Sequence, residues 1–184
     1  MNHTMILISG QPGAGKSTFA GWLAQKLCLP VVSYDRLLRK IREISPEAAQ
    51  GGELPYEIFL FEMEEHMGTA FIADYIFSVK QEAWLTELAA RHGCPTVNVH
   101  FACSPETAYA RYTQRNAQQP GPRTRPDIPF QRYLEATAQN RDFLWGDDVV
   151  HVDTEDFGRV SYEAVWRELA PLLGMAPELG STDQ

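Results

Sequence analysis

The feature that most constrains this chain is the segment from Gly10 to Thr18, which reads Gly-Gln-Pro-Gly-Ala-Gly-Lys-Ser-Thr. It matches the pattern GxxxxGK(S/T) and stands between an apolar run and an amphipathic stretch, as a loop that joins a strand to a helix would. The glycines allow successive N–H groups to point at phosphate oxygens, and the N-terminus of the following helix adds partial positive charge. The segment therefore predicts a loop that binds the phosphates of ATP.

Every position of this segment has an expected part in nucleotide binding. Lys16 can reach the β- and γ-phosphates, the Ser17 hydroxyl can ligate Mg²⁺, and Thr18 is expected to support the turn. A Gly-rich turn that arose by chance is the alternative, but the patterns on both sides favour ATP and Mg²⁺ as cofactors, and GTP fits the same motif. The predicted nucleotide-binding residues are Gly10, Gln11, Pro12, Gly13, Ala14, Gly15, Lys16, Ser17 and Thr18.

Short apolar runs alternate with helical stretches along the rest of the chain, which is typical of parallel strands joined by helical crossovers. At 184 residues the chain has the size of one domain. We therefore predict an α/β fold with three layers and a single domain over residues 1–184. The expected strands are approximately Met5 to Ser9, Val31 to Tyr34, Ala70 to Asp74, Thr96 to Ala102 and Val149 to Val152.

Two segments rich in proline and glycine interrupt this alternation. Ser45 to Leu54 is predicted to be a loop between a helix that ends near Ile44 and one that begins near Tyr56. Ala117 to Pro129 is predicted to be an exposed flap within a lid of about residues 111–132. The polar tail, residues 177–184, is expected to be frayed.

Two aspartates follow apolar runs, at the places where ligands of open α/β sheets bind. Asp35 is well placed to act as a general base toward an acceptor hydroxyl, and its alternative role is to cap a helix that begins at Arg36. Asp74 is expected to hold Mg²⁺ through water, and its alternative role is that of a turn residue. Tyr75 follows it where many ATP-driven motors have a glutamate, which disfavours a motor.

Arginines are concentrated in one stretch of an otherwise acidic chain. Arg111 and Arg115 are four positions apart on an expected helix, so they share a face and can aim at one target. Arg123 and Arg125 lie on the predicted flap, where closure can bring a guanidinium onto the transferring phosphoryl group. A solvated charged face is the alternative for each of these arginines.

Charge and composition exclude several classes of protein. The net charge of −8 disfavours nonspecific binding to nucleic acid, which depends on basic residues. The three cysteines show no zinc-binding spacing, and no apolar run approaches the length of about 20 residues that spans a bilayer. Because the N-terminus also lacks the positive start of a signal peptide, a cytoplasmic location without membrane contact is expected.

With these features together, residues 4–153 resemble the small P-loop kinases that group with chloramphenicol phosphotransferase, zeta toxins, gluconate kinase and polynucleotide kinase. The resemblance implies a sheet order of 2-3-1-4-5 and a helical lid. It also implies that Asp35 is the acceptor base, that Arg36 and Asp74 lie toward the acceptor, and that Arg115 and Arg123 contact ATP phosphates. It depends on Gly10 to Thr18, Asp35-Arg36, Ile72-Ala73-Asp74, and Cys103-Ser104-Pro105-Glu106 before Arg111 and Arg115.

These features predict an ATP-dependent kinase that phosphorylates a hydroxyl of a small molecule, with Asp35, Lys16 and Arg123 as catalytic residues. Two alternatives remain: a polynucleotide 5′-hydroxyl kinase, and a nucleotide-gated protein that binds ATP without productive transfer. The acceptor pocket is expected to include the loop Ser45 to Leu54, although a core helix whose aromatic rings face the sheet is the simpler interpretation of the residues after it. The expected pocket residues there are Tyr56, Phe59, Phe61 and Glu62.

Overall fold

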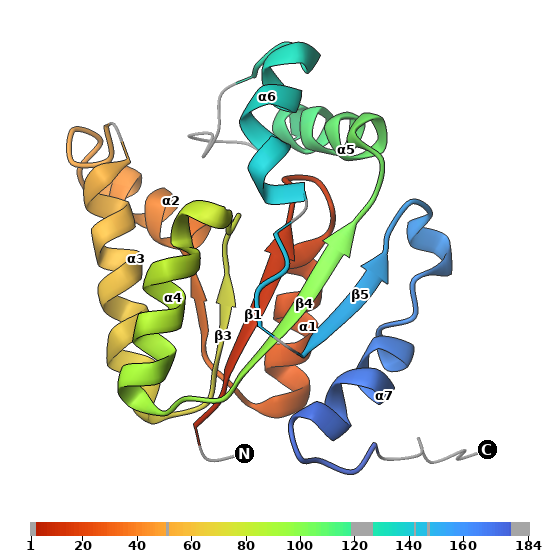
Figure 1. The fold of residues 1–184 in the computed structure, drawn as a ribbon. Coiled ribbons are helices and arrows are strands. Elements are labelled where there is room, and N and C mark those ends of the chain that lie inside the picture. Colours follow the sequence, from red (N-terminus) through yellow and green to blue (C-terminus); the bar gives the residue numbers. More distant parts are fainter. Residues whose placement is uncertain (1–2, 51, 119–126, 142, 147, 178–184) are drawn as a thin grey trace.

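The computed structural model describes residues 3–50, 52–118, 127–141, 143–146 and 148–177. Its centre is a five-stranded sheet in which all neighbouring strands are parallel, in the order β2-β3-β1-β4-β5 (Figure 1). The predicted fold class and the order 2-3-1-4-5 are therefore confirmed. The strands are β1 (Met5–Gly10), β2 (Val31–Ser33), β3 (Phe71–Asp74), β4 (Thr96–Ala102) and β5 (Val149–Asp153).

Helices connect the strands and supply the outer layers. Within the described ranges, every helix is too short or too polar to cross a membrane. The α-helices are α1 (Lys16–Leu27), α2 (Tyr34–Ile44), α3 (Glu53–Glu65), α4 (Val79–His92), α5 (Pro105–Gln118), α6 (Phe130–Arg141) and α7 (Tyr162–Leu172). Two single turns of 3-10 helix are η1 (His66–Gly68) and η2 (Phe157–Arg159).

Two hydrophobic cores lie on opposite faces of the sheet, which gives three layers (Figure 1). Ile6 and Ile8 of β1 belong to the core that α1 and α7 cover. Met5 and Leu7 belong to the core that α3 and α4 cover. Every residue of β1 is buried, as expected for the central strand of a parallel sheet with helices on both faces. This strand therefore gives the loop after it a rigid base.

Helices α5 and α6 lie beyond the carboxyl ends of the strands, over the loop that follows β1 (Figure 1). They share a small core of Ala108, Tyr112 and Tyr133. The Tyr133 hydroxyl donates a hydrogen bond to the carbonyl of Pro12 at 2.6 Å. The helices of the predicted lid are thus joined directly to the phosphate-binding segment.

The element boundaries correct two predictions about helix starts. The loop predicted over Ser45 to Leu54 ends early, because α3 begins at Glu53 and not near Tyr56. Pro55 fits there because the first turn of a helix makes no intrahelical use of its backbone N–H groups. Helix α2 begins at Tyr34, so Asp35 lies in its first turn and is not its N-cap.

The segment predicted to be a flap lies partly outside the described residues. Helix α5 continues through Gln118, so the first two residues of the predicted flap are helical. Arg123 and Arg125 both lie outside the described residues. Their predicted roles stay predictions.

Candidate functional site

The segment between β1 and α1 folds as a tight loop whose glycines have no substitute. Gly13 and Gly15 have φ angles of 92° and 96°, in the left-handed region that side chains disfavour. A Cβ atom at Gly13 would lie 2.1 Å from the carbonyl oxygen of Ala108, and one at Gly15 would lie 2.5 Å from the Phe157 ring. The loop therefore depends on glycine both for its backbone angles and for the close approach of neighbouring chain segments.

Three contacts hold the loop in this shape before any ligand binds. Lys16 is 7% exposed, and its Nζ donates to the backbone carbonyl of Gln11 at 3.0 Å. The Gln11 side chain donates to the carbonyl of Cys103 at 2.9 Å, so it is turned away from the loop interior. The third contact is the hydrogen bond from α6 to Pro12. The loop is thus a preformed cradle at the positive end of α1, which suits phosphate.

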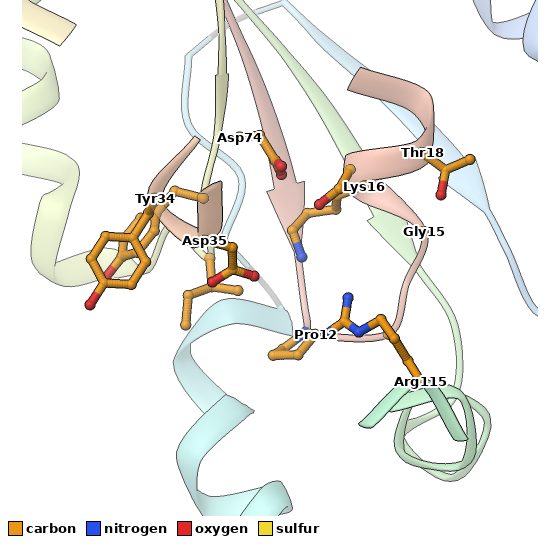
Figure 2. A pocket seen from close by; sticks show the side chains of 12 residues that line it. Pro12, Gly15, Lys16, Thr18, Tyr34, Asp35, Asp74 and Arg115 are labelled. Carbon is orange, nitrogen blue, oxygen red and sulfur yellow. The ribbon is translucent and has the colours of Figure 1, made fainter. Parts of the chain in front are cut away.

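Side chains from four different elements meet around this loop. Figure 2 shows the Lys16 amine, the Asp35 carboxylate and the Arg115 guanidinium pointing into one cavity beside Asp74. The cavity is also lined by Pro12, Gly13, Gly15, Ser17, Thr18, Tyr34, Tyr75 and Ile76. The structure thus brings together most of the residues that the sequence singles out.

Asp74 ends β3 in a buried position beside the start of α1. It is 5% exposed, and its carboxylate accepts a hydrogen bond from the Ser33 hydroxyl at 3.2 Å. Burial raises the pKa of Asp74, and the charge of Lys16 and a hydrogen bond from Ser17 oppose that rise. A buried carboxylate beside a serine hydroxyl supplies the oxygen donors that Mg²⁺ prefers. Ser17 and Asp74 therefore fit the predicted magnesium site.

Asp35 lies one residue into α2, where it faces the cavity and is only partly buried. An acidic side chain in the first turn of a helix also interacts favourably with the helix dipole. Ser33, the residue at the helix N-cap, makes no capping hydrogen bond with its side chain, because its hydroxyl is bonded to Asp74. The short segment where β2 meets α2 therefore contacts Asp74 through Ser33 and carries Asp35 two residues later.

The two arginines of α5 do not share one target. Arg115 lines the cavity around the loop. Arg111 instead donates to the carbonyls of Thr154 and Glu155 at 2.6 and 2.9 Å, and its guanidinium stacks 3.9 Å from the centre of the Phe157 ring. The expectation of one common target is therefore not met, because the segment after β5 offers Arg111 carbonyl oxygens and a ring face.

Glu155 fastens this segment to the start of α5. Its carboxylate accepts hydrogen bonds from the backbone N–H of Ser104 at 2.6 Å, from the Ser104 hydroxyl at 2.8 Å and from the Thr107 hydroxyl. These donors lower the pKa of Glu155 below its ordinary value, and the charge of Arg111 adds to the effect. The segment that carries Phe157 is thereby fixed beside the phosphate-binding loop.

Arg36 lies outside the wall of the phosphate cavity. It is exposed, and with Arg39 it lines an adjoining cavity of about 340 Å³ that also includes Ser17, Asp35 and Arg115. Arg36 therefore lies near the predicted base without lining the cavity around Lys16.

The predicted acceptor residues of α3 are dispersed. Phe59 is fully buried, which agrees with the interpretation as a core helix, and Phe61 is 60% exposed, so its expected place in a pocket is wrong. Glu62 lines a separate groove next to His66. Tyr56 contributes to a cavity near the site, together with Gly52 and Glu53 of the predicted segment Ser45 to Leu54.

Four residues that the sequence analysis did not assign to the site line this second cavity or the cavity around the loop. Tyr34 and Tyr75 line both cavities, Ile76 lines the cavity around the loop, and Gln81 lines the second one. A signal for the tyrosines was present, because each is the direct neighbour of a strand-end aspartate. Gln81 carried no such signal, since only the packing of α4 brings it there.

A family model described as an AAA domain matches residues 5–139. No curated protein matches the sequence.

Three solved structures have the same fold. A candidate kinase from Chloroflexus aurantiacus is 18% identical with a TM-score of 0.74, and the match covers 94% of this chain and 97% of the other. A gluconokinase from Sinorhizobium meliloti is 17% identical with a TM-score of 0.59, covering 94% and 93%. A shikimate kinase from Bacteroides thetaiotaomicron is 18% identical with a TM-score of 0.58, covering 94% and 99%.

At these identities the solved structures establish the fold, and the family model establishes the relationship. The matched residues contain the phosphate-binding loop, Asp35, Asp74 and Arg115. The matched range ends before β5 and α7, which complete the sheet and one of its outer layers. The chain therefore belongs to the AAA domain family.

Proposed function

We propose that this protein is a kinase that transfers the γ-phosphate of ATP to a hydroxyl group of a small molecule. The observation that carries the proposal is the convergence of Lys16, Asp35 and Arg115 on one cavity at the phosphate-binding loop. A positively charged cradle alone would serve any nucleotide-binding protein. A carboxylate that faces the same cavity adds a group able to accept the proton of an attacking hydroxyl.

The nucleotide phosphates would lie in the loop, held by its backbone N–H groups and by Lys16. In this state the Lys16 amine exchanges the carbonyl of Gln11 for phosphate oxygens. Ser17 and Asp74 would hold Mg²⁺, which neutralises the charge that develops on the phosphates. We propose that Arg111 contacts the nucleotide with the guanidinium face that the Phe157 ring does not cover.

Transfer needs one bond to form and one to break. The acceptor oxygen forms a bond to the γ-phosphorus as the bond from that phosphorus to the β–γ bridging oxygen breaks, and ADP leaves with the bonding electrons. Asp35 accepts the proton of the acceptor hydroxyl. Arg115 stabilises the charge on the transferring group, and we propose that Arg123 joins it from a lid of about residues 111–132.

A second candidate function is a polynucleotide 5′-hydroxyl kinase. Arg36 and Arg39 favour it, because these exposed guanidiniums line a cavity that contains Asp35 and could contact a phosphate backbone. The net charge of −8 opposes it.

The proposed site of action is the cytoplasm, which is supported by Cys28, Cys94 and Cys103 being free thiols.

The test is ATP consumption with Mg²⁺ across a panel of sugars, nucleosides, aromatic alcohols and 5′-hydroxyl oligonucleotides. A rise that depends on one small acceptor supports the proposal and identifies the substrate class. A rise only with oligonucleotides, falling steeply with salt, would support the second candidate. ATP binding with no stimulated turnover by any acceptor would contradict both and leave a nucleotide-gated protein.

A further inference from the structure

A cavity with three tyrosines in its wall adjoins the proposed transfer site. It measures about 330 Å³ and is lined by Tyr34, Tyr56, Tyr75, Gly52, Glu53 and Gln81. Tyr34 and Tyr75 also line the cavity around Lys16, so the two spaces meet at these rings. Figure 2 shows Tyr34 beside Asp35, with the tyrosine ring directed away from Lys16. Asp35 lines the cavity around Lys16 and not this one, so a molecule packed on the tyrosines would have to extend past their rings to bring a hydroxyl to Asp35.

The tyrosine rings form a preorganised wall. Tyr34 and Tyr75 pack edge to face with ring centres 5.1 Å apart, and Tyr56 lies 5.8 Å from Tyr75. Behind them the fully buried ring of Phe59 lies 5.1 Å from Tyr75. The Tyr56 hydroxyl accepts a hydrogen bond from Gln81 at 3.2 Å. Rings held on two sides lose little freedom when a ligand packs on them, so they favour a flat or cyclic partner.

The charge of the cavity is as informative as its shape. Glu53 is the one acidic or basic side chain among the described residues that line it. Lys80 lines a separate neighbouring cavity, and Arg115 lies on the phosphate side. Glu53 is exposed, so an anionic group beside it would meet like charge at the surface, with no basic side chain among the described lining residues to attract it. The cavity thus disfavours acids and phosphate esters.

We propose that this cavity, defined by Tyr34, Tyr56 and Tyr75, binds a ring-bearing alcohol that carries no anionic group. The inference rests on the proposed kinase function, because it names the class of acceptor for the same site. The ring packs on the tyrosines and the hydroxyl lies at Asp35. Selectivity arises from ring contact and from Glu53, and it does not use the exposed Arg36.

The first test is equilibrium binding to the protein loaded with MgADP, followed by ligand-observed NMR and calorimetry. The probes are para-methylbenzyl alcohol, para-carboxybenzyl alcohol and para-aminomethylbenzyl alcohol, which share a ring and a hydroxyl and differ in charge. Isoamyl alcohol is the probe without a ring. We expect the neutral and cationic rings to bind at least about fivefold more tightly than the anionic ring and the ring-free alcohol.

Variants assign that selectivity to named residues. Tyr75→Leu is expected to weaken binding of the neutral ring about fivefold, as loss of an aromatic contact would. Glu53→Gln is expected to reduce the preference for the cationic over the anionic ring. Phe61→Leu is the matched control, because Phe61 lies on the same helix as Tyr56 but is 60% exposed. A cooperative thermal melt shows that each variant is folded.

The outcomes separate this inference from the proposed function. If the ring alcohols bind with the expected selectivity but no hydroxyl compound accepts radiolabelled phosphate from ATP, the kinase proposal fails and the ring-binding cavity stands. If transfer occurs to anionic or ring-free acceptors and Tyr75→Leu leaves their KM unchanged, the kinase proposal stands and this inference is overturned. Absence of binding by all four probes also overturns it.

Discussion

Lys16 and Asp35 show how single side chains divide the work of the site. The Lys16 amine lies within the loop and is satisfied by the Gln11 carbonyl, whereas Asp35 faces the cavity from a different element. In the proposed function, Lys16 therefore acts on the nucleotide in the loop, and Asp35 acts on the acceptor that enters from the other side. Substitutions at the two positions should have different consequences.

Lys16→Ala is expected to weaken MgATP binding by about 10- to 100-fold, because a charge-assisted hydrogen bond to phosphate is lost. Asp35→Asn is expected to keep MgATP binding and to lower acceptor-dependent turnover by about 10²- to 10⁴-fold, because it removes the proton acceptor. Calorimetry with MgATP and a coupled ADP assay measure the two effects. Lys26→Ala, on the same helix but packed on Trp22 and Trp166, is the control for binding. Full turnover by Asp35→Asn would exclude that residue as the base.

Two glycines on either side of Lys16 provide a matched test of backbone strain. Gly13→Ala places a Cβ 2.1 Å from the Ala108 carbonyl oxygen at a φ of 92°, so we expect a loss of stability of about 1–3 kcal/mol and weaker MgATP binding. Gly21 lies inside α1, and a Cβ added there would have no neighbouring atom within 4 Å, so Gly21→Ala is expected to gain about 0.5–1 kcal/mol. Urea unfolding of both variants measures the difference. Equal effects would show that the loop is not strained.

At the scale of elements, the sequence pattern predicts the strands well and the helix starts less well, whereas the strand order is implied by the resemblance to small P-loop kinases. The strand Thr96–Ala102 is predicted with its observed bounds, because Val97, Val99 and Phe101 recur with the period of two that a strand requires. The start of α3 differs from the prediction because Pro55, which suggests a loop in the sequence, lies in the first turn of the helix. The sequence predicts part of the tyrosine-walled cavity, namely Tyr56 and the segment Ser45 to Leu54 that contains Gly52 and Glu53. It does not predict Tyr34, Tyr75 and Gln81 there, because these come from α2, the end of β3 and α4 and meet only through packing.

The connection between β5 and η2 gives a pH prediction. Hydrogen bonds from Ser104 and Thr107 hold the pKa of Glu155 below its ordinary value in the folded protein. The stability that this carboxylate contributes is therefore fully present above the unfolded pKa of about 4.3 and is lost as the pH falls through the lower folded value. Glu155→Gln should flatten that acid-side loss in thermal melts between about pH 5 and 2. Glu168→Gln, an exposed carboxylate of α7, is the control, and equal melting curves for both variants would contradict the assignment.

At the scale of the whole molecule, the phosphate-binding loop is the point where separate cores meet. It follows β1, which contributes side chains to both cores of the sheet, and it contacts the small core of α5 and α6 through Tyr133. A ligand bound there stabilises both the sheet and the helices above it. The nucleotide should thus act as a link between the two parts of the fold.

Tyr133→Phe tests this link. The variant leaves the Pro12 carbonyl without its donor at a buried position, so we expect a loss of about 1–3 kcal/mol of stability and weaker MgATP binding. Tyr109→Phe removes a comparable hydroxyl, which donates to the carbonyl of Ile128 at 2.9 Å, so it should lose stability without changing nucleotide affinity. Thermal shift with saturating MgATP separates the two, because a ligand at 100 times its Kd adds about 2.7 kcal/mol to the free energy of unfolding. An unchanged MgATP affinity in Tyr133→Phe would show that α6 and the loop are energetically independent, and it would remove the basis for treating α6 as part of the nucleotide site.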